Sequence, residues 1–239
     1  MKKTIGTRHE TSLHRDLKFS YAGKGGRIEA EVAGFVADGI NAQGEFIEVQ
    51  TGSFAPLKHK AKELAQRGKV RVVYPVIITK YIDVYDANAK RKYRRKSPRT
   101  GTPWDIFNAL VHAPDLPLIA GLAVELVLID ALELRVQDGK GSWRRKGVSI
   151  KDRRILAFHE RILLKKPSDY ARFIPFRSSE QFTSRSLGEK AGIRIDIARK
   201  VLYVLIRLGI IEKTGKQRNL TVYRRLNTPR RAQNSKTTK

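Results

Sequence analysis

The 239-residue chain contains no cysteine. Disulfide bridges, zinc sites with cysteine ligands and thiol catalysis are therefore excluded. A chain without cysteine fits a reducing cytoplasm, where disulfides are rare. We therefore expect a cytoplasmic protein whose stability depends on an apolar core. Hydrophobic residues make up 41% of the sequence and can form such a core.

The sequence also lacks a long uninterrupted apolar run. Its longest run, 116–134, contains Glu125, Asp130 and Glu133, whereas a membrane-spanning helix needs about 20 mostly apolar residues. The first ten residues carry two lysines with no apolar segment behind them, so they do not resemble a signal peptide. We expect the apolar run to be core, and no membrane to be a partner.

Acidic residues are scarce: 23 Asp and Glu stand against 49 Lys and Arg, which gives a formal net charge of +26. Such an excess destabilises the compact state by self-repulsion unless a polyanion offsets it. Nucleic acid fits best, with binding that weakens steeply as salt rises, so we expect association with the nucleoid. A ribosome-associated or membrane-surface protein would share the charge but would not explain where the acids gather.

The few acids gather in residues 27–52, where the pattern predicts a tight run of strands. Residues 28–36 and 46–50 alternate between apolar and polar side chains, with turn-forming residues between them at 41–44. We therefore expect a small sheet in this part of the chain.

Two carboxylates are predicted to meet at one end of this sheet. Because side chains alternate along a strand, Ile47 and Val49 point to one face, and Glu48 and Gln50 to the other. Asp38 lies on the neighbouring strand. Since Mg²⁺ is held by one or two carboxylates together with water and phosphate, the pair predicts half of a site for metal-assisted phosphodiester cleavage. The competing interpretation is a solvated sheet face.

The spacing Asp38…Glu48-Val49-Gln50 resembles the motif of the PD-(D/E)XK nuclease superfamily, over roughly residues 5–80. That family has a core in the order helix, three strands, helix and strand; the corresponding elements are predicted at 8–20, 27–50, 54–67 and 70–78. Many members place a third acid on the first helix, where Glu10 stands here. The resemblance implies an α+β fold with a central mixed sheet, and Mg²⁺ or Mn²⁺ held by Glu10, Asp38 and Glu48.

Two positions depart from the family pattern. Gln50 replaces the usual lysine after Glu-X, and Ala37 replaces the usual proline before the aspartate. The lysine would orient and help deprotonate the attacking water, whereas a neutral glutamine only positions it. On the resemblance, Lys58 or Lys60 of the following helix would substitute for the missing cation.

Ordinary structural roles compete with the metal site for two of these acids. Thr7 and Glu10 have the spacing of a helix capping box, and His14 falls one turn later on the same face. Asp38 with Gly39 is a common turn dipeptide. The sequence leaves both roles open for each acid.

Two basic segments with aromatic residues among the cations follow. Segment 89–101 is either a flexible solvated loop or a phosphate-contacting loop, and 139–154 is a second such cluster, in which Trp143 either packs on the duplex or anchors its loop. The candidate DNA contacts are Arg94, Arg95, Lys96, Arg99, Arg144, Arg145 and Lys146. Between these segments, 122–136 is rich in Val, Ile and Leu and favours a strand, although a buried helix fits the same run.

The C-terminal third predicts a winged helix. Its elements are a helix at 151–165, a short helix capped by Thr183 and ended by Gly192, a longer helix at 193–208 and a two-stranded wing at 210–225. Helix–turn–helix proteins place the second helix of the pair in the major groove. The candidate contacts are Arg194, Arg199 and Lys200 on that helix and Lys213, Lys216 and Arg218 on the wing. Such domains also serve protein–protein contacts.

These features predict a nuclease-like domain at 1–138, a basic linker at 139–150, a winged helix domain at 151–226 and a disordered basic tail at 227–239. The predicted function is metal-dependent cleavage of double-stranded DNA, by a homodimer if both strands are cut. The alternative is a non-catalytic DNA-binding regulator or architectural protein on a degenerate nuclease fold, which Gln50 favours. RNA ranks lower, because no aromatic-rich RNA-binding motif is visible.

Overall fold

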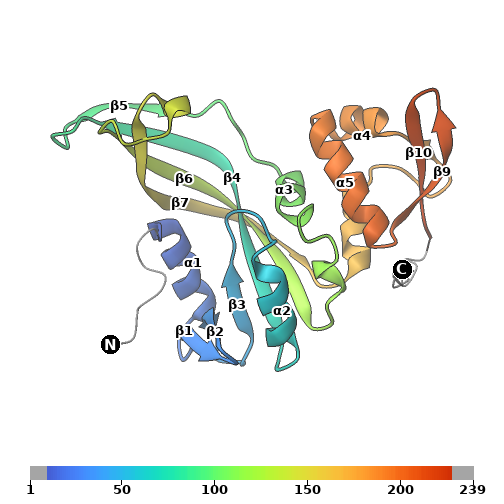
Figure 1. Cartoon of the computed structure of the whole chain (residues 1–239), viewed down its shortest axis with the longest axis horizontal. Helices are drawn as coiled ribbons and strands as arrows, with labels where there is room; N and C mark the ends of the chain where they lie inside the picture. Colours follow the sequence, from blue (N-terminus) through green and yellow to red (C-terminus); the bar gives the residue numbers. More distant parts are fainter. Residues whose placement is uncertain (1–9, 228–239) are drawn as a thin grey trace, which may run out of the picture. The chain divides into compact units, whose positions relative to one another are not determined.

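Residues 10–227 are described in the computed structural model of the chain. They form a mixed α+β fold with a central sheet of seven strands and a second sheet of three strands (Figure 1). The chain divides into two compact units. The first comprises the residues up to Thr51 with 73–103 and 126–162, and the second comprises 52–72, 104–125 and the residues from Leu163 onward.

The predicted order of helix, three strands, helix and strand is present. These elements are α1 (Ser12–Ala22), β1 (Arg27–Val32), β2 (Phe35–Ile40), β3 (Phe46–Val49), α2 (Leu57–Ala65) and β4 (Val70–Tyr85). β1 pairs with β2, and β2 with β3, both in antiparallel orientation. The element order is thus confirmed, while its assignment to a nuclease core stays a prediction.

Three more strands complete the central sheet: β5 (Arg91–Lys96), β6 (Leu122–Gln137) and β7 (Val148–Leu164). The strand order is β1-β2-β3-β4-β6-β7, with β5 paired to β4. β6 confirms the strand favoured for 122–136. β5 corrects the loop predicted in 89–101, because its backbone pairs antiparallel with the last residues of β4 although its side chains are exposed.

β7 corrects the helix predicted at 151–165. Its apolar residues have helical spacing, but the segment is an extended strand at the end of the central sheet, next to β6. Its side chains alternate accordingly, since Leu156 and Phe158 are exposed whereas Ile155 packs against the core. Pairing with β6 therefore outweighs the local pattern. Residues 139–162, predicted as linker and start of the C-terminal domain, belong to the first unit.

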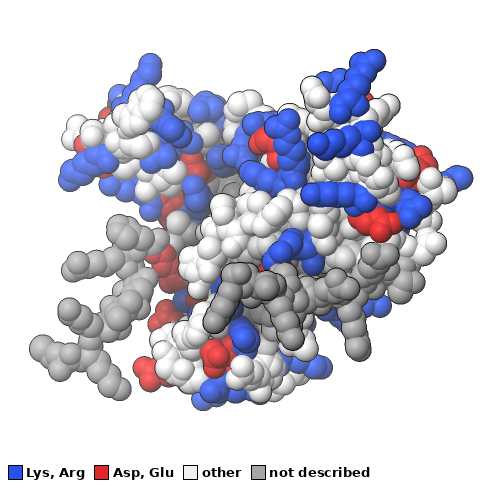
Figure 2. Space-filling view, turned by 45° about the vertical axis from the view of Figure 1, so that its right-hand side comes forward, with Lys and Arg blue, Asp and Glu red and all other residues white. Residues whose placement is uncertain are grey.

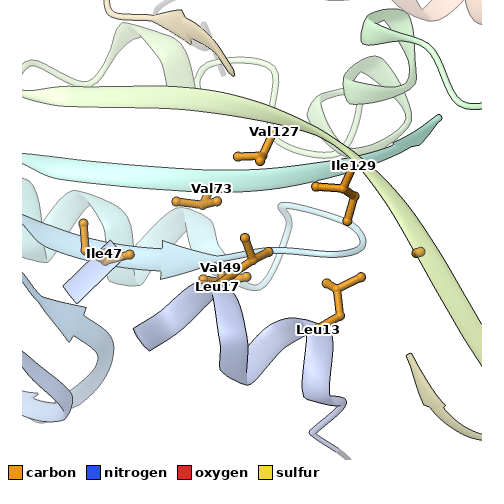
Figure 3. Close-up of a cluster of buried hydrophobic side chains, with 8 residues drawn as sticks. Leu13, Leu17, Ile47, Val49, Val73, Val127 and Ile129 are labelled. Atoms are coloured by element: carbon orange, nitrogen blue, oxygen red, sulfur yellow. The ribbon is translucent and has the colours of Figure 1, made fainter. Parts of the chain in front are cut away.

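The core of the first unit lies between α1 and the central sheet. Leu13 and Leu17 of α1 pack against Ile47 and Val49 of β3, and the cluster continues across the sheet through Val73, Val127, Ile129 and Ala131 (Figure 3). Ile47 and Val49 thus share a face, as predicted. Each buried Leu, Ile or Val side chain contributes about 1.5–3 kcal/mol, so this core fixes α1 on the sheet.

Two local interpretations of acidic residues are wrong. α1 begins at Ser12 with Thr11 as its N-cap, so Glu10 precedes the helix and does not complete a capping box in its first turn. Thr7, the proposed partner, lies outside the described residues. Asp38 lies within β2, so it is not a turn residue; the turn predicted at 41–44 connects β2 to β3.

The second unit ends in a helix pair and a small sheet. Its C-terminal elements are β8 (Gln181–Phe182), α4 (Ser184–Ala191), α5 (Ile195–Arg207), β9 (Ile211–Gln217) and β10 (Leu220–Arg225). The three strands are antiparallel in the order β8-β10-β9. The predicted helix pair, the Thr183 cap and the hairpin are confirmed, while β8 was not predicted. The tail predicted at 227–239 lies outside the described residues except for Asn227.

Within 10–227 no helix is both long and apolar enough to cross a membrane.

Candidate functional site

Glu10, two residues before α1, and His14 and Lys18 on α1 align three ionisable side chains. His14 Nδ1 lies 2.9 Å from Glu10 Oε1, four positions earlier in the sequence. Lys18 Nζ, one turn further, lies 3.0 Å from the same Glu10 oxygen and 3.0 Å from Glu29 Oε1 on β1. We call Glu10, His14, Lys18, Glu29 and Asp38 the acid–histidine cluster.

Asp38 and His14 together bind the backbone of Val49. Asp38 Oδ2 accepts a hydrogen bond from the Val49 N–H at 2.8 Å, and His14 Nε2 lies 3.0 Å from the Val49 carbonyl oxygen. The pairing of β2 with β3 covers Phe46 and Ile47. The two side chains therefore supply hydrogen-bond partners to β3 at a position that the ladder does not cover.

His14 is surrounded by groups that favour its charged form. A carbonyl and a carboxylate only accept hydrogen bonds, so the contacts at both ring nitrogens favour a doubly protonated ring. Burial alone lowers the pKa of His14, but the hydrogen bond and charge of Asp38, the Val49 carbonyl and the charge of Glu10 together raise it above its ordinary value of 6.5. The surroundings of His14 in the cluster therefore favour the imidazolium form.

Lys18 is the buried cation of the cluster. Burial lowers its pKa, but the hydrogen bonds to Glu10 and Glu29 and the charges of Asp38 and Glu10 outweigh this effect and raise it. The sequence interpretation missed this lysine, although the spacing of four between positions 10, 14 and 18 was a signal that all three share a face.

The other predicted catalytic residues lie on β3, directly after it and on α2. Glu48 is buried on β3, with 1% of its surface exposed, and the Gln50 N–H donates to the Val73 carbonyl at 2.9 Å. Lys58 and Lys60 belong to the second unit, where Lys58 Nζ lies 3.9 Å from Asp115. Across residues 10–227, no group of three or more His, Asp or Glu is arranged to hold a metal ion.

β5 carries the first predicted set of DNA contacts. All six of its residues are exposed, but Arg94 is held by Asp83 of β4, with its Nε and Nη2 atoms 2.6 and 2.8 Å from the two carboxylate oxygens. The hydrogen bonds from Arg94 hold the pKa of Asp83 below its ordinary range. Arg95 and Lys96 on the same strand, and Arg99 beyond it, are exposed.

The turn between β6 and β7 carries the second set. Arg144, Arg145 and Lys146 are exposed around a 3-10 helix at Trp143–Arg145. Arg145 also donates from Nε to the Val148 carbonyl at 3.2 Å. Figure 2 shows many lysine and arginine side chains on the visible face of the molecule, with acidic side chains in small separate groups.

α5 and the β9–β10 hairpin carry the third set. Arg194 and Arg199 are exposed, as are Lys213, Lys216 and Arg218 of the hairpin. Lys200 differs from the prediction, because its Nζ donates to Asn108 Oδ1 at 2.6 Å and the side chain lies against the unit. The outward row of α5 instead consists of Ile195, Arg199 and Tyr203, of which Ile195 is 41% and Tyr203 49% exposed. Their spacing of four was the signal that the sequence interpretation missed.

Comparisons with known proteins identify the family to which this chain belongs. A protein of Treponema pallidum (strain Nichols), with the name "Uncharacterized protein", is 30% identical to this chain over 223 residues, which are 93% of this chain and 88% of the relative. No solved structure matches the chain. The model of the family "Domain of unknown function (DUF8091)" matches residues 11–165, which extend from the N-cap of α1 to the end of β7. The chain therefore belongs to the DUF8091 family.

Proposed function

We propose that the protein binds double-stranded DNA and that the helix pair and hairpin of residues 181–225 act as a winged helix. The observation that carries the proposal is the strand order β8-β10-β9 beside the pair α4–α5. A short strand, two helices and a hairpin in this arrangement leave one face of the second helix uncovered. Proteins with a helix–turn–helix insert that face into the major groove.

The local sequence supports a rigid helix pair. The Thr183 N–H donates to Ser186 Oγ at 2.8 Å and closes a capping box at the start of α4. Gly192 ends α4 with a φ of 64°, which glycine adopts without strain. At Gly188 a β-carbon would lie 3.0 Å from the Ile193 carbonyl oxygen, so a glycine there allows close approach of the turn that joins the helices.

The outward face of α5 has the chemistry of a recognition helix. The major groove admits one α-helix, and arginine binds guanine O6 and N7 through two hydrogen bonds. Arg194 precedes the first turn and Arg199 lies in the outward row. Tyr203 adds an exposed aromatic side chain to the same row. The exposed cations of the hairpin then suit the phosphate backbone, where contacts position the protein without reading sequence.

The first experiment measures the affinity of the full chain for a random 25-base-pair duplex by fluorescence anisotropy, at several salt concentrations. Arg199→Ala is compared with Arg67→Ala, which removes the same charge from the turn after α2. We expect Arg199→Ala to weaken binding about tenfold, within the range of one good arginine contact, and Arg67→Ala to change it little. Equal effects of the two substitutions would contradict the assigned surface.

Metal-dependent cleavage of DNA is the second candidate function. It is supported by the order of α1 to β4, which follows the PD-(D/E)XK pattern, and by the positions of Asp38 and Glu48 on neighbouring strands. As arranged, Asp38 is bound to the Val49 N–H and to His14, and Glu48 is buried. Within residues 10–227 no group of three or more His, Asp or Glu is arranged to hold a metal ion, so DNA binding is the function that we place first.

Supercoiled plasmid incubated with Mg²⁺, Mn²⁺ or EDTA separates the two candidates. A nuclease would nick or linearise the plasmid only with metal, and a double substitution of Asp38 and Glu48 to alanine would abolish cleavage while sparing binding. Our proposal predicts salt-sensitive binding by both proteins without cleavage. Metal-dependent cleavage that disappears in the double variant would make the second candidate the correct one.

A further inference from the structure

The turn between β6 and β7 exposes a tryptophan. The Trp143 side chain is 83% exposed at the start of a 3-10 helix. Tryptophan is highly buried on average, and burying an aromatic side chain stabilises a fold. The chain's other tryptophan, Trp104, has its ring edge against Phe173, with centroids 5.8 Å apart. Trp143 is therefore not stabilised by burial of its ring in the way that Trp104 is.

The turn that carries Trp143 is closed by backbone hydrogen bonds. Gly141 N–H donates to the Gly147 carbonyl, and Lys146 N–H to the Trp143 carbonyl, both at 2.9 Å. A β-carbon at Gly141 would lie 1.9 Å from the Val148 carbonyl oxygen, so only glycine fits there. The indole is thus presented by a hydrogen-bonded turn.

The surroundings of the indole are cationic. The Arg144 guanidinium carbon lies 5.7 Å from the ring centroid, and Lys140, Arg145 and Lys146 are exposed in the same turn. The Asp138 carboxylate at the start of this turn is engaged by Lys151 and Ser149, whose hydrogen bonds hold its pKa far below the ordinary range.

β5 extends this cationic surface and adds a second exposed aromatic ring. Lys92 Nζ of β5 donates to Gln137 Oε1 at 2.7 Å, which joins β5 to the end of β6. Tyr93 on the same strand is 47% exposed. Aromatic rings set among cations are the arrangement with which proteins hold single-stranded nucleic acid, where the rings stack on bases and the cations follow the phosphates.

We infer that the Trp143 turn and β5 form a site for unpaired DNA, in which the indole stacks on a base. The inference rests on the proposed function for its choice of DNA as the ligand. Stacking needs an open base face, and in an intact duplex each base face is covered by its neighbours. The site therefore discriminates unpaired from paired DNA, a distinction separate from the duplex binding assigned to α5.

Tryptophan fluorescence reports directly on this stacking. In a Trp104→Phe variant, Trp143 is the sole tryptophan. We expect a 15-nucleotide single strand to quench its emission strongly, the same sequence as a duplex to quench it weakly, and heparin, a polyanion without bases, not to quench it. Because Trp104→Phe alters a packed residue, the difference spectrum between the wild-type chain and Trp143→Phe serves as a second readout.

Affinity measurements complete the test. Trp143→Ala should weaken single-strand binding about tenfold, in line with the stacking energy of one base, and leave duplex binding unchanged, while Trp143→Phe retains most of the affinity. A bound single strand without quenching, equal quenching by heparin, or a spectral change with anionic vesicles alone would overturn the inference. Quenching by single strands with no duplex binding through α5 would instead refute the proposed function.

Discussion

His14 lies between two carboxylates and a carbonyl, and this position makes the stability of the fold depend on pH. The folded state raises the pKa of His14 above the ordinary value of 6.5, so the native protein binds the proton more tightly than the unfolded chain does. Its contribution is then fully present below pH 6.5 and is lost as pH rises through the higher folded-state pKa.

This pH dependence can be measured by urea unfolding of wild type and His14→Gln across that range. The difference in the free energy of unfolding should shrink as pH rises, because the wild type loses the imidazolium. His112→Gln, at an exposed position, controls for the loss of a histidine side chain in itself. A His14 difference that is constant with pH would contradict the assigned contacts.

Glu133 is a buried charged side chain within the central sheet. It is 1% exposed and accepts hydrogen bonds from Arg135 and from Arg153 at 2.9 Å, with Lys80 Nζ 3.7 Å away. Burial alone raises its pKa, but the bonds to both arginines and the charge of Lys80 lower it overall. The carboxylate is therefore the common partner of three cations.

Glu133→Gln should destabilise the protein by about 3–5 kcal/mol, the usual consequence of removing one partner of a buried ion pair. Glu160→Gln, an exposed position on β7, is the matched control and should change stability by less than about 0.5 kcal/mol. Urea unfolding measures both. If Glu133→Gln lowered the free energy of unfolding no more than Glu160→Gln does, water would be shown to replace the carboxylate among the cations.

At the scale of elements, the sequence predicted most of the helices, strands and turns that local patterns determine. The strands from β1 to β3, the turn between β2 and β3, the strand β6 and the helix pair follow from alternation, turn residues and caps. β7 was predicted wrongly because Ile155, Phe158 and Ile162 have helical spacing, while pairing with β6 is a non-local interaction that no local pattern contains.

Only part of the candidate site was predicted, because its other contacts are also non-local. Glu10 and Asp38, which the resemblance assigned to one site, both lie beside His14. Lys18 was missed because its role depends on Glu29, from another strand. Lys200 was assigned to the outward face of α5, but its bond to Asn108 is a contact over 92 positions of sequence, which spacing within one helix does not indicate.

The turn between α4 and α5 gives a prediction at this scale. Gly192 has a φ of 64°, and a β-carbon in the left-handed region costs about 1–2 kcal/mol. Gly192→Ala should therefore lower the free energy of unfolding by about that amount, and Gly192→Asn by less, because asparagine tolerates this conformation. Thermal unfolding checks the order; equal stability of the wild type and the alanine variant would contradict the conformation assigned to the turn.

At the scale of the whole molecule, the net charge of +26 makes any contact with DNA sensitive to salt. Five of the exposed cations at α5 and its hairpin are candidate DNA contacts: Arg194, Arg199, Lys213, Lys216 and Arg218. If each neutralises one phosphate, the logarithm of the duplex affinity falls with the logarithm of the salt concentration with a slope of about −4.5.

Removing Lys216 and Arg218 together should make that slope shallower by about 1.8, without changing the relative affinity for different duplex sequences, since phosphate contacts do not read bases. Anisotropy titrations from low to moderate salt measure the slope. An unchanged slope in the double variant would place the phosphate contacts elsewhere on the chain.

The central claim is that the outward face of α5 lies against duplex DNA. The chain has no cysteine, so one introduced cysteine can carry an iron–EDTA group that cleaves DNA only nearby. We predict that the group cleaves a bound duplex efficiently from Tyr203→Cys on α5 and poorly from Glu160→Cys on β7. Equal cleavage from the two positions, or cleavage from position 160 alone, would contradict the account.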